Sequence, residues 1–179
     1  MREARTLSRD VDAAAIPYGD KIPLVAGTTV FITQALGGSY TVMTDRGYMV
    51  RIEGNDADAI GEQPTAAPTA AEVAGRPLQE LAWDQLKTCF DPEIPVNIVD
   101  LGLVYKCEIA PLAEGGEKVT VHFTLTAPGC GMGDYLKQDV ERKIEGLPGV
   151  KETDVQVVFE PAWEQSMMSE AARLQLGLM

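Results

Sequence analysis

The chain has 179 residues, of which 45% are apolar and 23% are charged, so it has enough apolar material for a folded core and does not have the composition of a disordered chain. Fifteen Lys and Arg against 27 Asp and Glu give a net charge of −12, which disfavours binding to nucleic acid or to an anionic membrane surface. No apolar run approaches the roughly 18 residues of a membrane span, and the first residues lack an apolar signal core. We therefore expect a cytoplasmic protein with one ordinary domain and one smaller unit.

The N-terminal third is predicted to be an arm followed by a small β unit. Residues 1–19 have mixed charge and weak periodicity, which is typical of a flexible arm. Residues 20–61 contain three short runs of β-branched and aromatic residues, at 29–33, 40–44 and 48–52, separated by glycine-containing turns. We expect these runs to form a small all-β meander.

A linker and a second domain follow. Residues 62–75 are rich in alanine and contain two prolines, which favours an extended linker. Residues 76–179 are predicted to form an α/β (α+β) domain, in which a small open three-stranded sheet carries helices on one face. The apolar periodicities predict, in chain order, a helix over 78–90, strands over 101–109 and 119–126, a helix over 132–147, a strand over 155–159 and a helix over 164–176.

Three cysteines are present, and their spacing limits what they can do. Cys89, Cys107 and Cys130 are odd in number and form no Cys-x-x-Cys pair, which argues against a disulfide framework and against a self-contained zinc or iron-sulfur site. Cys89 and Cys107 fall on apolar faces of a predicted helix and strand, where structural thiols are common. The single histidine, His122, leaves little scope for histidine-based catalysis.

Cys130 is the best candidate for chemistry because it lies between a predicted strand and a predicted helix. The unpaired amides and dipole of a helix N-terminus favour the thiolate. The neighbouring Gly129 and Gly131 remove side-chain bulk, so that a ligand, a metal or a partner sulfur can approach. The alternative is that the glycines only build a tight turn around a small buried residue.

Two further features are candidates for function. Asp91 and Glu93 flank a proline, and such a pair of carboxylates can serve acid/base chemistry, hold a hard cation, or cap a turn. Trp163 follows a Glu-Pro-Ala run and is interpreted as a structural anchor in the core or as an interface residue.

Long segments of the sequence resemble a known family. Residues 91–105 (DPEIPVNIVDLGLVY) resemble the opening signature of the small domain shared by SufT-type iron-sulfur assembly proteins, the eukaryotic cytosolic iron-sulfur targeting factor and the phenylacetate-degradation D component. Residues 124–130 (TLTAPGC) resemble the family's Thr and Cys turn, and residues 161–163 resemble its proline-tryptophan ending, with an alanine where many members have a second proline. Residues 32–42 and 56–61 look like parts of an extra N-terminal domain of SufT-type proteins.

The resemblance implies a non-enzymatic auxiliary factor, a carrier or adaptor, in iron-sulfur cluster assembly and in the maturation of iron-sulfur proteins. Its expected partners are the iron-sulfur assembly machinery and apo-client proteins. It makes Cys130 the functional thiol and places Asp91, Glu93 and Thr126 in one pocket, next to Gly129 and Gly131.

A cubane cluster takes about four ligands, so one well-placed cysteine holds a cluster only transiently or with help from another chain. No stable cofactor is expected. A homodimer that brings two Cys130 thiols together as ligands is one hypothesis.

Two alternatives remain at this point. Cys130 can be the nucleophile of an enzyme that acts on thioesters or in sulfur transfer, with Asp91 or Glu93 as the base in place of a histidine. The chain can also be a structural subunit of a larger complex, in which Trp163 would matter more than Cys130.

Overall fold

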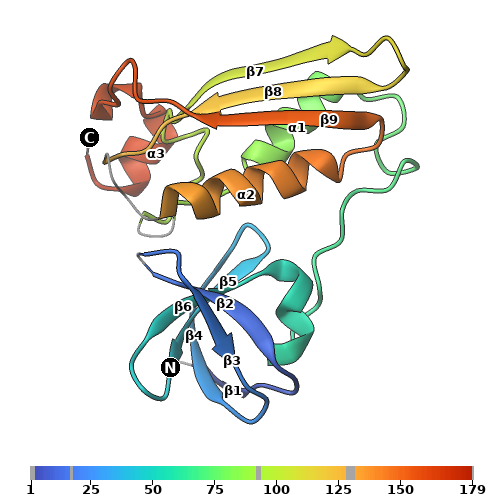
Figure 1. Ribbon diagram of the computed structural model, residues 1–179. Coiled ribbons are helices and arrows are strands. Elements are labelled where there is room, and N and C mark those ends of the chain that lie inside the picture. Colours follow the sequence, from blue (N-terminus) through green and yellow to red (C-terminus); the bar gives the residue numbers. More distant parts are fainter. Residues whose placement is uncertain (1–2, 17, 92–93, 128–131, 179) are drawn as a thin grey trace. The chain divides into compact units, whose positions relative to one another are not determined.

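The computed structural model describes residues 3–16, 18–91, 94–127 and 132–178. By its internal contacts the chain divides into two compact units, residues 1–66 and 67–179. This division falls inside the predicted linker. Figure 1 traces both units along the sequence.

The first unit is a six-stranded antiparallel sheet with the spatial order β1-β4-β5-β6-β2-β3. The predicted meander is confirmed as β4, β5 and β6, whose inward-facing Val30, Val42 and Val50 are fully buried. The elements are β1 (Glu3–Thr6), β2 (Val11–Ala15), β3 (Lys21–Leu24), β4 (Thr29–Leu36), β5 (Ser39–Thr44), β6 (Met49–Ile52) and the 3-10 helix η1 (Gly54–Ile60).

The prediction of a flexible arm over residues 1–19 was wrong. β1 pairs with β4 through four residues, and β2 pairs with both β3 and β6. Leu7, Val11 and Ala13 are buried in the core of this unit. The error arose because β2 contains three alanines, which have weak strand propensity, and because the apolar alternation is too short to stand out.

The predicted linker is held at both ends rather than extended throughout. The amide N–H of Thr65 donates to the carbonyl of Gly54, and its hydroxyl donates to the carbonyl of Gly38, both in the first unit. Thr69 and Glu72 form reciprocal hydrogen bonds that start a turn, and Val73 packs against the core of the second unit. These contacts leave the residues near 66 as the junction.

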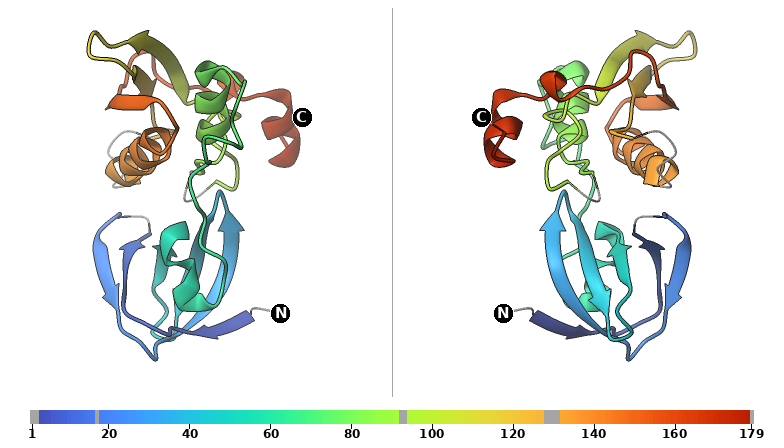
Figure 2. Two further views of the ribbon diagram at one scale, coloured as in Figure 1. Left: turned by 90° about the vertical axis from the view of Figure 1, so that its right-hand side faces the viewer. Right: turned by 90° about the vertical axis from the view of Figure 1, so that its left-hand side faces the viewer.

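The second unit is a three-stranded sheet with the order β7-β8-β9, which confirms the predicted fold class. β7 and β8 form an antiparallel hairpin, whereas β8 and β9 are parallel and are therefore joined by a crossover through α2. Figures 1 and 2 show α1 and α2 on the same face of the strands. The elements are α1 (Leu78–Leu86), β7 (Val104–Pro111), β8 (Glu117–Phe123), α2 (Met132–Glu145), β9 (Val150–Val157), the 3-10 helix η2 (Gln165–Met167) and α3 (Glu170–Gln175).

The end of the chain departs most from the predicted elements. β9 begins at Val150, five residues earlier than predicted, and the predicted helix over 164–176 is divided into η2 and α3. The division falls at Ser169, whose hydroxyl accepts a hydrogen bond from the amide of Ala172 and so caps α3. The amide of Ser169 itself donates to Asp100, a tertiary contact that no helical periodicity reveals.

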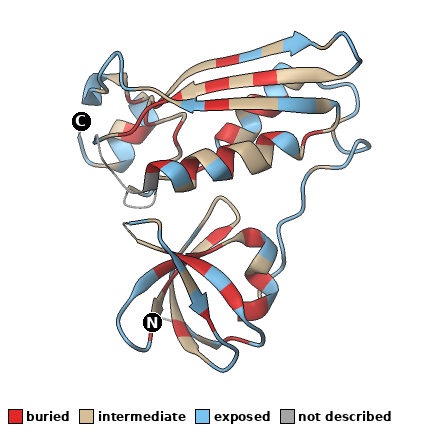
Figure 3. Cartoon of the chain, viewed as in Figure 1, coloured by how far each residue is buried: buried red, intermediate tan, exposed pale blue. Residues whose placement is uncertain are grey.

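The core of the second unit lies between the helices and the sheet. Figure 3 shows buried positions recurring along α1 and α2 and in the middle of the strands. Leu86, Phe123 and Val140 are fully buried there. Ile98 and Leu103, from the segment between α1 and β7, are also fully buried, and each such side chain contributes roughly 1.5–3 kcal/mol. The segment that carries the family signature is therefore anchored on the core.

Candidate functional site

The site predicted from the sequence lies only partly within the described residues. Asp91, Thr126 and Trp163 have defined positions. The other predicted site residues, Glu93, Gly129, Cys130 and Gly131, lie outside the described residues. The roles assigned to these seven residues stay predictions, and the structure defines the described segments on either side of residues 92–93 and 128–131.

Asp91 stabilises the turn in which it lies. Its Oδ1 accepts a hydrogen bond from the amide of Ile94 at 3.1 Å, and its own amide donates to the carbonyl of Val96. This agrees with the capping role considered from the sequence, because a short carboxylate side chain that accepts from a nearby amide mimics a turn. One observed task of Asp91 is therefore to shape the start of the signature loop.

The signature loop, residues 94–103, is stiffened by its own hydrogen bonds. The Asn97 side-chain oxygen accepts from the amide of Asp100 at 2.9 Å, while the Asn97 amide group donates to the Asp100 carboxylate at 2.8 Å. The amide of Ile98 donates to the carbonyl of Cys89, which ties the loop to the end of the α1 region. The loop is consequently a fixed structure and not a loose connection.

The second motif segment begins beside the end of this loop. The amide of Thr124 donates to the carbonyl of Leu103 at 2.8 Å, directly after the β7–β8 pair Val104 and Phe123. Thr124 is buried and Thr126 is half-buried. Antiparallel pairing therefore brings the segment that leads to Cys130 next to the segment that follows Asp91.

The first turn of α2 packs closely on the same segment. A Cβ atom at Gly133 would lie 2.8 Å from a terminal methyl of Leu125, so any larger residue there would force the Leu125 side chain to shift. The flanks of residues 128–131 are thus held together by Leu125 on one side and Gly133 on the other.

The other two thiols are buried, as predicted. Cys89 is fully buried, and burial raises its pKa, with the nearby Asp139 carboxylate acting in the same direction. Burial also raises the pKa of Cys107 to about 11. Both thiols remain protonated at neutral pH, which makes them poor nucleophiles and poor metal ligands.

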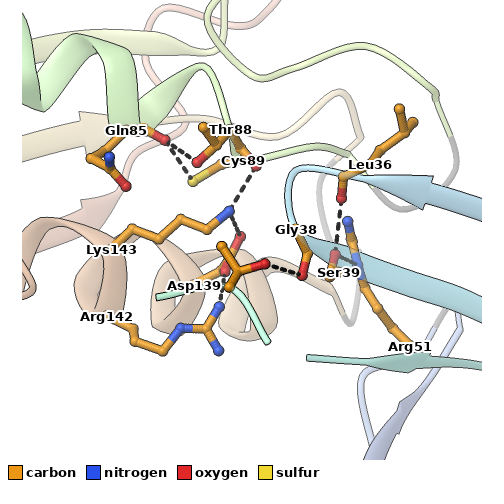
Figure 4. A network of polar contacts seen from close by, with 11 residues as sticks. Leu36, Gly38, Ser39, Arg51, Gln85, Thr88, Cys89, Asp139, Arg142 and Lys143 are labelled. Atoms are coloured by element: carbon orange, nitrogen blue, oxygen red, sulfur yellow. Dashed lines mark hydrogen bonds and ion pairs between the residues drawn. The ribbon is translucent and has the colours of Figure 1, made fainter. Parts of the chain in front are cut away.

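A partly buried polar network supports the turn just before Asp91. Lys143 on α2 donates to the carbonyl of Thr88 at 2.7 Å and pairs with Asp139 at 3.4 Å, as drawn in Figure 4. Arg142 pairs with the same carboxylate. The cation of Lys143 thus faces a carbonyl at the carboxyl end of α1, where the helix dipole favours positive charge. The spacing of residues along α2 predicts the ion pairs of Asp139 with Arg142 and Lys143. It does not predict the hydrogen bond from Lys143 to the carbonyl of Thr88, which is 55 residues away in the sequence.

Trp163 has the contacts of an anchor. Its indole N–H donates to the carbonyl of Leu101 at 2.7 Å, and the ring packs half-buried against the core. The interface role remains a prediction.

Within residues 3–16, 18–91, 94–127 and 132–178, no three His, Cys, Asp or Glu side chains are grouped as metal ligands. In the same part of the chain, no helix is both long enough and apolar enough to span a membrane.

Part of the second unit matches a known protein family in sequence. A family model described as iron-sulfur cluster assembly protein matches residues 80–157. An Fe-S protein maturation auxiliary factor of Porphyromonas gingivalis is 48% identical over 94 residues, which are 52% of this chain and 86% of the relative. The Fe-S protein maturation auxiliary factor SufT of Staphylococcus aureus is 40% identical over 88 residues, which are 49% of this chain and 96% of the relative. The chain therefore belongs to the iron-sulfur cluster assembly protein family.

A solved structure of a domain of unknown function from Bacillus anthracis is also similar. It is 31% identical, covers 57% of this chain and 93% of its own length, and has a TM-score of 0.49. The 88 matched residues are 96% of the staphylococcal relative, so that protein is about 92 residues long. A protein of this length is too short to contain counterparts of both units. The resemblance of the first unit to an extra SufT-type domain therefore stays a prediction.

Proposed function

We propose that this chain is a non-enzymatic auxiliary factor that promotes the maturation of iron-sulfur proteins, with Cys130 as its functional thiol. The observation that carries the proposal is the convergence of the two motif segments, through the hydrogen bond between Thr124 and Leu103, at the end of the sheet that leads to Cys130. The similar proteins from P. gingivalis and S. aureus are named as Fe-S protein maturation auxiliary factors.

The other two thiols support the assignment to Cys130. Cys89 and Cys107 are buried and have raised pKa values, so neither is suited to handle a cluster or a sulfur atom. In this proposal an iron-sulfur cluster is cargo, and the ligands that one cysteine lacks come from a partner protein or from a second copy of the chain. The protein acts in the cytoplasm on the assembly machinery and on apo-client proteins.

The proposal is tested by cluster transfer between purified proteins. A scaffold protein loaded with a cluster is mixed with an apo iron-sulfur enzyme, and the return of enzyme activity is followed with and without this chain. We expect the wild-type chain to accelerate activation and Cys130→Ala to lose at least about tenfold of that acceleration, because the thiolate is the ligand. Cys107→Ala is the matched control, since it removes a thiol that stays protonated.

Activation by Cys130→Ala at the wild-type rate would contradict the role of the thiol. Absence of any acceleration by the wild-type chain would contradict the maturation function itself.

A further inference from the structure

The C-terminal segment, residues 158–178, lies beyond the part of the chain that the family model matches, residues 80–157. It contains η2 and α3 and contributes only Met168 and Ala172 to the buried core. Hydrogen bonds join it to the signature loop, residues 94–103. We therefore expect the segment to have a role besides filling the core.

Three hydrogen bonds run from the C-terminal segment to backbone carbonyls of the signature loop. Because the acceptors are main-chain atoms, these bonds fix the path of the loop backbone. Each bond joins residues that are far apart in the sequence. The donors and acceptors are Trp163 Nε1 and Leu101 O at 2.7 Å, Ser169 N and Asp100 O at 2.8 Å, and Gln175 Nε2 and Pro95 O at 3.0 Å.

Close packing accompanies the hydrogen bonds. Gly102 has a positive φ of 76°, and a Cβ atom there would lie 2.2 Å from the carbonyl oxygen of Met167. Only glycine permits this contact, because the clash would be with backbone. Tyr105, just beyond the loop, donates to the carbonyl of Pro161 at 2.8 Å and contacts the Met167 sulfur.

The same contacts reach Asp91 through the loop. Gln175 holds the carbonyl of Pro95, and the preceding residue, Ile94, donates its amide to the Asp91 carboxylate. The direction of that carboxylate therefore depends on where the loop backbone lies.

We propose that the C-terminal segment is a positioning element for the candidate site: Trp163, Ser169 and Gln175 hold the signature loop, and through it Asp91, in the arrangement that the maturation activity uses. This inference rests on the proposed function, because the maturation activity is what the positioned loop and Asp91 are expected to serve.

Trp163→Phe tests the proposal in the full chain, since it keeps an aromatic ring and removes the donor to Leu101. Trp83→Phe is the matched control: Trp83 lies on α1, packs half-buried against the same core, and makes no hydrogen bond to the loop among the described residues. Hydrogen exchange is measured at the amides of Leu101 and Leu103 in the loop, and of Val121 in β8.

We expect Trp163→Phe to raise exchange at the loop amides by about tenfold and to leave β8 unchanged. The side-chain ¹³C resonance of Asp91 and the amide proton resonance of Ile94 should shift, which a general loss of stability would not produce. Activation of the apo-enzyme should fall at least about threefold, whereas Trp83→Phe should match the wild type in all these measurements.

Unchanged loop exchange in Trp163→Phe, or an equal rise in β8, would overturn the proposal. Faster exchange at the loop amides combined with wild-type activation of the apo-enzyme would also overturn the proposal. The exchange and resonance data do not depend on activity, so failure of the wild-type chain to activate the apo-enzyme would refute the proposed function, while these data still decide whether the segment positions the loop.

Discussion

The three cysteines of this chain differ in the environments that the fold and the sequence give them. Cys89 lies at the end of the α1 region beside Asp139, and Cys107 points from β7 into the core. Both positions could be predicted from the sequence, because each cysteine falls in an apolar periodic pattern. The glycines on either side of Cys130 are also visible in the sequence, and they distinguish the sequence context of this cysteine from that of the other two.

Alkylation of the folded chain should therefore be selective. At pH 8 a thiol with a pKa of about 11 is about 100-fold less ionised than one with the usual pKa of about 9, so Cys107 should react at least about 100-fold more slowly than in the unfolded chain. Cys89 should be slower still, and Cys130 should react first. Mass spectrometry after timed iodoacetamide treatment, with a urea-unfolded sample as control, measures all three rates.

The raised pKa of Cys107 also predicts how the stability of the fold depends on pH. Because the folded state raises this pKa, the contribution of the buried thiol to the free energy of unfolding is present below pH 9 and is lost as the pH rises toward about 11. Equal alkylation of Cys107 and Cys130 in the folded chain would contradict the assignment.

At the scale of elements, α2, the C-terminal segment and the residue that follows β8 each hold a different part of the chain between α1 and β7. Lys143 fixes the turn before Asp91, Trp163 holds the signature loop at Leu101, and the bond between Thr124 and Leu103 fixes the end of the loop. The helices α1 and α2 and the strands β7 and β8 could be predicted from periodicity. These ties could not, because each acceptor is a backbone carbonyl remote in the sequence, and no residue type marks it.

The contacts that Lys143 on α2 makes with Thr88 and Asp139 should contribute measurably to the free energy of unfolding. Lys143→Met removes the donor to Thr88 and a cation beside buried Asp139, and we expect it to lower the free energy of unfolding by about 1–3 kcal/mol. Lys137→Met, on the same helix, removes a cation that is 42% exposed and 4.0 Å from Glu141, and should cost less than about 0.5 kcal/mol. Urea unfolding of both variants provides the comparison, and equal losses would show that Lys143 is not specially placed.

At the scale of the whole molecule, the sequence predicted the second unit better than the first. The α/β domain, its three strands and its family signature were all visible, because apolar periodicity and a long motif coincide there. The strands β1 and β2 were missed because they are short and find their partners in β4 and β6, more than 20 residues away. The division of the last helix at Ser169 was missed for a similar reason, since the bond to Asp100 is tertiary.

The most direct test of the account is the activity of several iron-sulfur enzymes in a strain that lacks this protein, grown under iron limitation and complemented with the wild-type chain or with Cys130→Ala at matched protein levels. The account predicts that the wild-type chain restores the activities and that folded, equally abundant Cys130→Ala does not. Equal restoration by both would contradict the central role of the thiol, and unchanged activities in the deletion strain would contradict the maturation function.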